Sequence, residues 1–336
     1  MRKTMRLKVA SCAVALLVGA GSVWGQGRGG NAASTAAPAS GGPVDPLLLE
    51  DLALSYRILT DKGLMDGLGH SSIRHPSNPN RYFISRNRAT GLVTPADLIE
   101  MDLDSRPVIA GERSYNEVAI HAEIYKVRPD VMAIIHHHSP GMVSFGMGKV
   151  PLMPVNQSSR FLLDGVPWWD YRDINIPGDK GWEETNLIHT PARGAAVART
   201  LGGSPAILLV NHGAVVVGAT IQEAVGRAIY MEEAAQVQTA AMQRGGPIKY
   251  YDAAGELRAT GSRSDFARQW DLWKHDGCVK AGFCKPELAN RPAAGRGGNA
   301  AAGAGRGAGG GGRGAGGAGR GAGGGGREGR EGAPRD

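Results

Sequence analysis

Cysteine is what this chain of 336 residues most clearly lacks, since only Cys12, Cys278 and Cys284 are present. Three cysteines exclude a disulfide-rich scaffold and cannot supply a four-cysteine zinc site. Cys12 lies in a segment that we expect to be removed, which leaves the other two. The five residues between them are compatible with one local disulfide and equally with two free thiols.

Long apolar runs are also lacking. The run "VASCAVALLVGA" near the N-terminus is too short to cross a bilayer. It precedes a small-residue stretch that ends near Gly25, and it follows four basic residues, Arg2, Lys3, Arg6 and Lys8. This order is typical of a secretory signal peptide. We therefore expect residues 1–25 to be a signal peptide and the mature protein to be exported, periplasmic or secreted, with no transmembrane segment. "VASC" also fits a lipoprotein cleavage site, although the apolar stretch before it is short.

Acidic residues are absent from residues 1–44 and rare in residues 288–336, where three acids accompany eight arginines. The formal charge of +7 therefore comes from the two ends, and it gives little reason to expect a nucleic-acid partner. The C-terminal segment of Gly, Ala and Arg has no aromatic side chain for base stacking. It also lacks large apolar side chains, so we expect a disordered tail over 288–336 and a flexible linker over 26–44.

One folded domain remains, over residues 45–287. Helical periodicity covers 47–59, 114–128 and 220–242, and apolar strand-like runs cover 131–138 and 206–218. Asp45 before Pro46 is a good start for the first helix. Strands mixed with helices in this way indicate a layered α/β or α+β fold.

Three consecutive histidines close the apolar run "VMAIIHHH". In a strand, successive side chains point to opposite faces, so His136 and His138 share one face and His137 lies on the other. His212 follows a second buried run, "AILLV", and Gly213 after it allows close backbone approach. Three neutral imidazoles suit a divalent metal and leave positions open for a substrate. Zn²⁺ is the first expectation, with Mn²⁺, Fe²⁺ and Co²⁺ as alternatives.

Glu117 has two competing interpretations. It precedes the histidine strand, and a carboxylate beside a metal can move a proton during catalysis. It also stands three residues after Ser114, which is the spacing of a helix capping box. Spacing alone does not decide between them. His121, one turn later, could support the site or fill the core.

Four segments together carry a family resemblance: "GLGHSSIR", "LVTPADLIEMDLD", "NEVAIHAEIYKVRPDVMAIIHHHSP" and "LLVNHGAVVVGATIQEAV". Over about Leu47 to Tyr251 the chain resembles the class II aldolase/adducin family. The resemblance implies an α/β three-layer α/β/α sandwich with a mainly antiparallel central sheet. It also implies a homotetramer with active sites between subunits. The family's metal histidines fall on His136, His138 and His212, and its acid/base glutamate falls on Glu117.

The chain departs from the sugar-phosphate aldolases of that family. Their phosphate-binding segments resemble "GNxS", "TPSG" and "SSE", whereas this chain has "GHSS", "SRNRA" and "YNE". Its segments look more like a branch that decarboxylates aromatic or ring-opened acids, such as dihydroxyphthalate or hydroxymuconic-semialdehyde-type compounds. Arginine pairs well with carboxylates, although a solvated loop would also explain the two arginines. The resemblance assigns five residues to the substrate: His70, Ser72, Ser85, Arg86 and Arg88.

The sequence therefore predicts a metal-dependent carbon–carbon lyase that decarboxylates a hydroxylated aromatic or oxo acid, a small-molecule carboxylate. Three alternatives stay open. One is a class II aldolase that acts on a non-phosphorylated hydroxy-oxo acid. Another is an adducin-like binding protein without turnover, which the presence of all three histidines disfavours. The last is a metal-dependent oxygenase, because three histidines also suit iron.

Overall fold

The computed structural model describes residues 36–148, 150–173, 176–180, 184–252, 266–282 and 284. The expected signal peptide and the Gly/Ala/Arg tail lie outside these residues. Part of the expected flexible linker lies within them, and it is bound to the domain. The Ser40 hydroxyl and the Gly41 N–H each donate a 2.6 Å hydrogen bond to the carboxylate of Glu100. Ser40 and Gly41, at the end of the expected flexible linker, therefore have hydrogen-bond partners on the folded domain.

A seven-stranded sheet forms the centre of the domain, in the order β3-β2-β1-β4-β7-β6-β5. Its neighbouring strands pair antiparallel except for β5 and β6, which pair in parallel. The strands are β1 (His70–Arg74), β2 (Arg81–Ser85), β3 (Leu98–Asp102), β4 (Ala133–His137), β5 (Trp168–Trp169), β6 (Ala206–Leu209) and β7 (Gly213–Gly218). The predicted mainly antiparallel sheet is confirmed.

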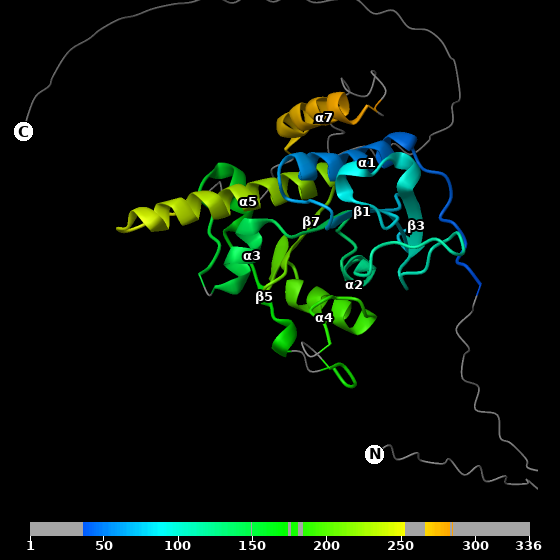
Figure 1. The fold of residues 1–336 in the computed structure, drawn as a ribbon, viewed down its shortest axis with the longest axis horizontal. Helices are drawn as coiled ribbons and strands as arrows, with labels where there is room; N and C mark the ends of the chain where they lie inside the picture. Colours follow the sequence, from blue (N-terminus) through cyan, green and yellow to red (C-terminus); the bar gives the residue numbers. More distant parts are fainter. Residues whose placement is uncertain are drawn as a thin grey trace, which may run out of the picture. The chain divides into compact units, whose positions relative to one another are not determined.

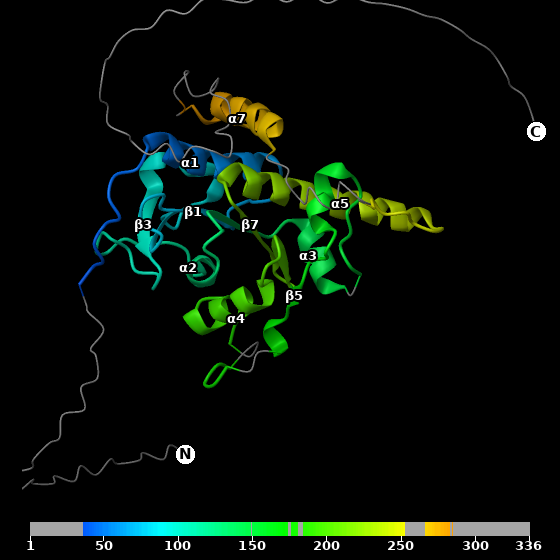
Figure 2. The same ribbon diagram turned by 180° about the vertical axis from the view of Figure 1, so that it is seen from behind.

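Helices cover both faces of this sheet, as Figures 1 and 2 show from opposite sides. One face carries α1 (Pro46–Asp61), α3 (Pro140–Met147) and α5 (Ile221–Arg244), with α7 (Ala267–Ala281) packed on α1. The other face carries α2 (Val118–Val127) and α4 (Pro191–Leu201). In the described connections, short 3-10 helices lie at Thr90–Leu92, Pro95–Asp97, Gln157–Leu162 and Tyr171–Asp173. The α/β/α sandwich is confirmed.

The central strands are apolar on both faces because each face meets a helical layer. In β4, Ala133 and Ile135 belong to the core under α1 and α5, while Ile134 belongs to the core under α2 and α4. This explains why the run before the histidines is continuously hydrophobic and does not alternate. The same alternation decides which face each histidine after it occupies.

Two further expectations meet the structure here. Cys278 and Cys284 form a disulfide with a Cα–Cα distance of 5.2 Å, within the usual range, so the alternative of two free thiols is wrong. Among the described residues, no helix is both long enough and apolar enough to span a membrane.

Candidate metal centre

Four side chains that are distant in sequence meet at one point of the domain. Glu117, His136, His138 and His212 each offer a ligand atom, and these four atoms lie within 4.8 Å of one another. The expectation that the three histidines and the glutamate come together is therefore confirmed. His137 is turned away from them, as strand alternation predicts. It is fully buried, and neither ring nitrogen has a hydrogen-bond partner in the described part of the chain.

The ends of two adjacent strands bring the histidines together. His136 is near the end of β4, His138 follows that strand directly, and His212 lies in the turn between β6 and β7. β4 pairs with β7, with His137 opposite Ala214, so the turn lies beside the strand end. A side chain at Gly213 would collide with the His137 carbonyl oxygen. The small residue after His212 is therefore required for this close approach.

Glu117 enters the cluster from the start of α2. The helix begins at Val118, so Glu117 occupies the N-cap position and its side chain does not cap the helix. Ser114 instead donates its hydroxyl to the Ser85 carbonyl oxygen at 2.7 Å. The capping-box interpretation is wrong, because the helix starts three residues later than that interpretation requires. The carboxylate is thereby available to the cluster.

The carboxylate of Glu117 is held at both oxygens. Oε1 accepts a 2.8 Å hydrogen bond from the backbone N–H of Ile188, and Oε2 lies 3.5 Å from Nε2 of both His136 and His212. Burial alone would raise the pKa of Glu117, but its interactions with these two histidines bring the pKa well below its usual value. The group is therefore an ionised carboxylate at neutral pH.

These donors fit a divalent cation. His136 donates Nδ1–H to the Ala214 carbonyl oxygen at 3.0 Å, which leaves a lone pair on Nε2. Nε2 of His138 lies 2.9 Å from that atom, and burial lowers the pKa of His138 to about 3, so its ring is neutral. Ligand atoms in a tetrahedral zinc site lie about 3.4 Å apart, given bonds of about 2.0–2.1 Å. The separations of 2.9 and 3.5 Å are close to this value, and all four ligand atoms lie within 4.8 Å of one another.

His70 borders the cluster on the neighbouring strand. It pairs with His136 in the β1–β4 register, and the two ring centroids are 4.9 Å apart. The ring of Tyr115 stacks on it at 5.0 Å. Burial lowers the pKa of His70 well below its usual value, so the ring is neutral. This position agrees with the predicted role of His70 beside a substrate.

A buried chain of hydrogen bonds fixes the orientation of the His70 ring. Nδ1 of His70 lies 2.6 Å from Nε2 of His121, and Nδ1 of His121 lies 2.6 Å from the Ser72 hydroxyl. That hydroxyl lies 2.8 Å from the hydroxyl of Tyr125. Glu117, His121 and Tyr125 are spaced at four residues on α2, which places them on one face of the helix. His121 therefore supports the site.

The direction of this chain follows from its buried end. The Tyr125 hydroxyl has no other partner in the described part of the chain, and a buried hydroxyl normally donates its hydrogen. Donation from Tyr125 to Ser72, then to His121 and to Nδ1 of His70, leaves Nε2 of His70 as an N–H donor. Ser72 is fully buried and acts within this chain. Its predicted role in contacting the substrate is corrected, because both neighbours of its hydroxyl are protein groups.

Three predicted substrate residues lie in the "SRNRA" segment: Ser85, Arg86 and Arg88. Their hydrogen-bond and ion-pair partners could not be predicted from the sequence. Ser85 is buried and donates its hydroxyl to the Arg86 carbonyl oxygen. Arg88 donates Nη1 to the Asp97 carboxylate at 3.1 Å, and Nε of Arg86 lies 3.7 Å from the same oxygen. Both arginines are about half exposed. In the described part of the chain they are paired with an acid, and no ion pair joins them to the cluster.

Tyr115 nevertheless connects this segment to His70, which borders the cluster. The Tyr115 hydroxyl donates to the Arg88 carbonyl oxygen at 2.8 Å while its ring stacks on His70. Sequence reasoning missed Tyr115, although its place in "YNE" next to Glu117 was a signal. It also missed Ile188, which contributes only a backbone N–H and so leaves no side-chain signal.

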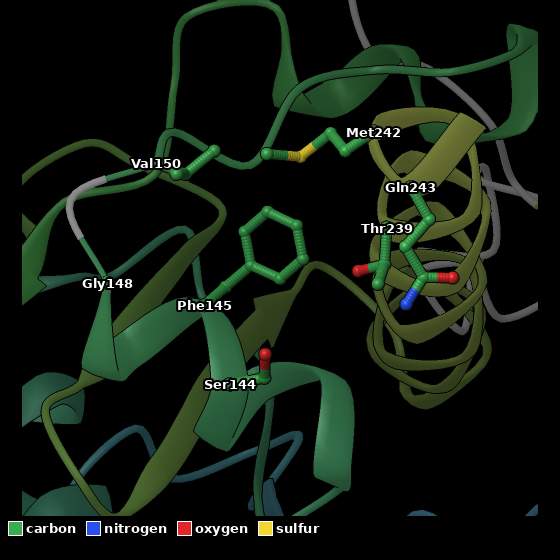
Figure 3. A pocket seen from close by; sticks show the side chains of 7 residues that line it. All are labelled: Ser144, Phe145, Gly148, Val150, Thr239, Met242 and Gln243. Carbon is green, nitrogen blue, oxygen red and sulfur yellow. The ribbon is translucent and has the colours of Figure 1, made fainter. Parts of the chain in front are cut away.

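An apolar pocket lies elsewhere, between α3 and the end of α5 (Figure 3). Its volume is about 370 Å³, and Figure 3 shows Phe145, Val150 and Met242 facing it. None of its seven lining residues belongs to the histidine cluster. A well-formed apolar pocket is often a candidate binding site, but here the converging polar groups are the stronger guide.

Three histidines at the strand ends of a mainly antiparallel sheet, with a carboxylate at the start of α2, define a candidate metal enzyme. Residues 50–239 match the family model of the class II aldolase and adducin N-terminal domain, which covers more than half of the chain. The chain belongs to this family, and the resemblance seen in the sequence is confirmed.

Named relatives include decarboxylases and an aldolase. Decarboxylase tropJ of Talaromyces stipitatus is 32% identical over 254 residues, covering 69% of this chain and 94% of that protein. The 3,4-dihydroxyphthalate decarboxylase of Arthrobacter keyseri is 27% identical over 240 residues, covering 68% and 91%. The structure of L-fuculose 1-phosphate aldolase from Glaciozyma antarctica has a TM-score of 0.57 at 26% identity, covering 72% and 96%. These similarities support a lyase.

Proposed function

We propose that this protein is a metal-dependent decarboxylase of a hydroxylated aromatic or oxo acid. The observation that carries the proposal is the single cluster of Glu117, His136, His138 and His212. Similarity to named decarboxylases supports it further. The chain lacks the phosphate-binding segments "GNxS", "TPSG" and "SSE", which disfavours a sugar-phosphate substrate.

His136, His138 and His212 would hold the cation, with Zn²⁺ as the first expectation. A bound divalent cation would supply Lewis-acid stabilisation of the negative charge that remains when a carbon–carbon bond breaks. The protein keeps two of these imidazoles in the required state. The Ala214 carbonyl oxygen fixes the tautomer of His136, and burial keeps His138 neutral.

Glu117 is the proton carrier in this proposal. As an ionised carboxylate it takes the proton of a substrate hydroxyl group. The bond to the substrate carboxyl group then breaks, CO₂ leaves, and the electron pair stays on the remaining carbon. Glu117 returns its proton to that carbon, and solvent supplies a proton to the substrate oxygen. The reaction consumes one proton in total, and its atoms and charges balance.

Recognition of the substrate carboxylate is assigned to His70 and the Ser85–Arg88 segment. Given the direction of its hydrogen-bond chain, Nε2–H of His70 would be a neutral donor on a ring that lies 4.9 Å from the ring of His136. Arg86 and Arg88 bring positive charge that Asp97 partly offsets. A substrate carboxylate would compete with Asp97 for these guanidinium groups, so we expect them to act mainly on binding.

Replacing Arg88 with glutamine is expected to raise KM for the acid about 10- to 100-fold, because hydrogen bonds to charged groups contribute about 1.5–3 kcal/mol. The turnover number kcat should change little. The matched control is Arg106→Gln, since Arg106 is equally exposed and also pairs with an aspartate, Asp102. Steady-state kinetics of CO₂ release measures both constants. An unchanged KM in Arg88→Gln and in Arg86→Gln would remove these residues from the substrate site.

The proposed activity is tested by incubating metal-loaded protein with hydroxylated benzoates, phthalates and oxo acids that carry a ¹³C-labelled carboxyl group. We expect labelled CO₂ and one equivalent of decarboxylated product, formed without oxygen and stopped by a chelator. Aldehyde without CO₂ would favour an aldolase. Product that requires O₂ would favour an oxygenase. Metal binding without turnover of any compound would favour an adducin-like binding protein.

We also propose a homotetramer and export from the cytoplasm, on the basis of the family resemblance and the N-terminal sequence. Light scattering on the purified protein tests the first, and a monomeric mass would contradict it. A reporter fused to residues 1–30 tests the second, and a reporter that stays in the cytoplasm would contradict it.

A further inference from the structure

The orientation of the Glu117 carboxylate depends on residues 184–190, a described segment that contains no helix or strand. The backbone N–H of Ile188 donates to Oε1 at 2.8 Å, which leaves Oε2 facing the two histidine nitrogens. Ile188 lies between the short helix at Tyr171–Asp173 and the start of α4. No strand pairing or helix in the described part of the chain fixes this N–H. Some other group has to hold it in place.

The side chain of Arg193 holds this loop. Its Nη1 donates to the carbonyl oxygens of Thr185 and Leu187, each at 2.7 Å. The Leu187 carbonyl belongs to the same peptide as the Ile188 N–H, so the bond to it fixes the group that reaches Glu117, and the bond to Thr185 holds the chain just before it. Arg193 is completely buried, and such a side chain is rarely buried without full pairing.

Asp179 completes the arrangement on the other edge of the guanidinium. Its Oδ2 accepts from Nε of Arg193 at 2.7 Å, and its Oδ1 accepts from Nη2 at 2.6 Å. This bidentate pair neutralises the buried charge and fixes the plane of the guanidinium. Lysine has no planar fork and could not hold two carbonyl groups and a carboxylate in this geometry.

Contact between α4, which carries Arg193, and α2, which begins after Glu117, fixes Arg193 relative to Glu117. Arg193 is the third residue of α4, and its backbone N–H donates to the Thr190 hydroxyl that caps this helix. The next residue, Gly194, lies against the Ala119 carbonyl oxygen in the first turn of α2, where any side chain would collide. Arg193 and Glu117 are therefore placed relative to each other by direct helix contact.

We propose that Arg193, paired with Asp179, is a positioning residue for the Glu117 carboxylate. It sets the position of the Ile188 N–H and so aims Oε2 at the histidine cluster. The inference rests on the proposed role of Glu117 as proton carrier. Among the described residues, the hydrogen bonds and ion pair of Arg193 join it to Thr190, Asp179, Thr185 and Leu187 and not to the four cluster residues, so its effect should pass through the Ile188 N–H to Glu117.

The test uses Arg193→Lys and the isosteric Asp179→Asn, each made in the native chain and in Glu117→Gln. In the native background we expect kcat for CO₂ release to fall about 10- to 100-fold, since a misplacement of about 1 Å can cost that much. KM should stay within about threefold. In the Glu117→Gln background the same changes should have no further effect on kcat, because the positioned group is already disabled.

A second readout does not depend on turnover. The visible spectrum of the Co²⁺-loaded protein should shift in Arg193→Lys, because the carboxylate next to the ion has rotated. It should not shift when the same change is added to Glu117→Gln. If the protein turns over no acid, the proposed function fails, while this spectroscopic comparison still decides the role of Arg193.

The chain offers a matched control in Arg128. This arginine forms the same pattern, a bidentate pair with Asp130 and bonds from Nη1 to the carbonyl oxygens of Gly202 and Ser204. It lies at the opposite end of α2 from Glu117. Arg128→Lys should leave kcat and the Co²⁺ spectrum unchanged. Equal losses of kcat in both backgrounds with an unchanged spectrum would overturn the proposal and leave Arg193 a purely structural role.

Discussion

Replacing His138 with alanine is expected to remove the bound metal and to lower decarboxylation by roughly three orders of magnitude or more. The loss follows because a Lewis acid contributes several kcal/mol to stabilising the charge that develops when the bond breaks. His138 is the one cluster member that is only partly buried, so this change should disturb the fold least. Metal analysis of the purified protein and a CO₂-release assay measure the two effects together.

The control for this change is His275→Ala, because His275 is exposed on α7 and lies outside the cluster. It should keep full metal content and activity. A His138→Ala protein that is free of metal and still releases CO₂ at the native rate would show that the cluster does not serve the reaction. Retained metal with full activity would remove His138 from the ligand set.

Replacing Glu117 with glutamine is expected to lower kcat by about 10²- to 10⁴-fold with little change in KM, which is the range for loss of a positioned acid–base group. Glutamine keeps the shape of the side chain and can still accept the hydrogen bond from Ile188. It cannot take up a proton. Steady-state kinetics gives both constants, and metal analysis shows whether the cation remains bound.

Glu123→Gln is the matched control, since Glu123 lies on the same helix, pairs with Lys126 and is not a member of the cluster. Its kinetics should equal those of the native protein. An active Glu117→Gln protein would contradict the role of proton carrier. Loss of the metal in Glu117→Gln would instead make the carboxylate chiefly a ligand.

The members of the histidine cluster could be predicted from the sequence because their positions depend on local geometry. Alternation along β4 separates His137 from His136 and His138, and the buried run before His212 marks a second strand end. The layered α/β class follows equally from local patterns. The antiparallel order of the sheet came from the family resemblance, since strand pairing joins segments far apart in the chain.

The partners of the polar side chains could not be predicted in the same way. The bond between Glu117 and Ile188 spans 71 residues, and the donor is a backbone group that any residue type would supply. The sequence has the capping-box spacing at Ser114, but the Ser114 hydroxyl donates its hydrogen bond to the Ser85 carbonyl oxygen. Asp97 likewise forms ion pairs with Arg86 and Arg88. Such competition between partners is decided by tertiary packing.

The most direct test of the central claim is a crystal structure of the metal-loaded protein, with anomalous diffraction recorded at the absorption edge of the metal. The account predicts one strong anomalous peak within bonding distance of Nε2 of His136, a nitrogen of His138 and a nitrogen of His212. The Glu117 carboxylate should lie beside it. A fully loaded crystal whose anomalous peak lies away from these histidines would contradict the account.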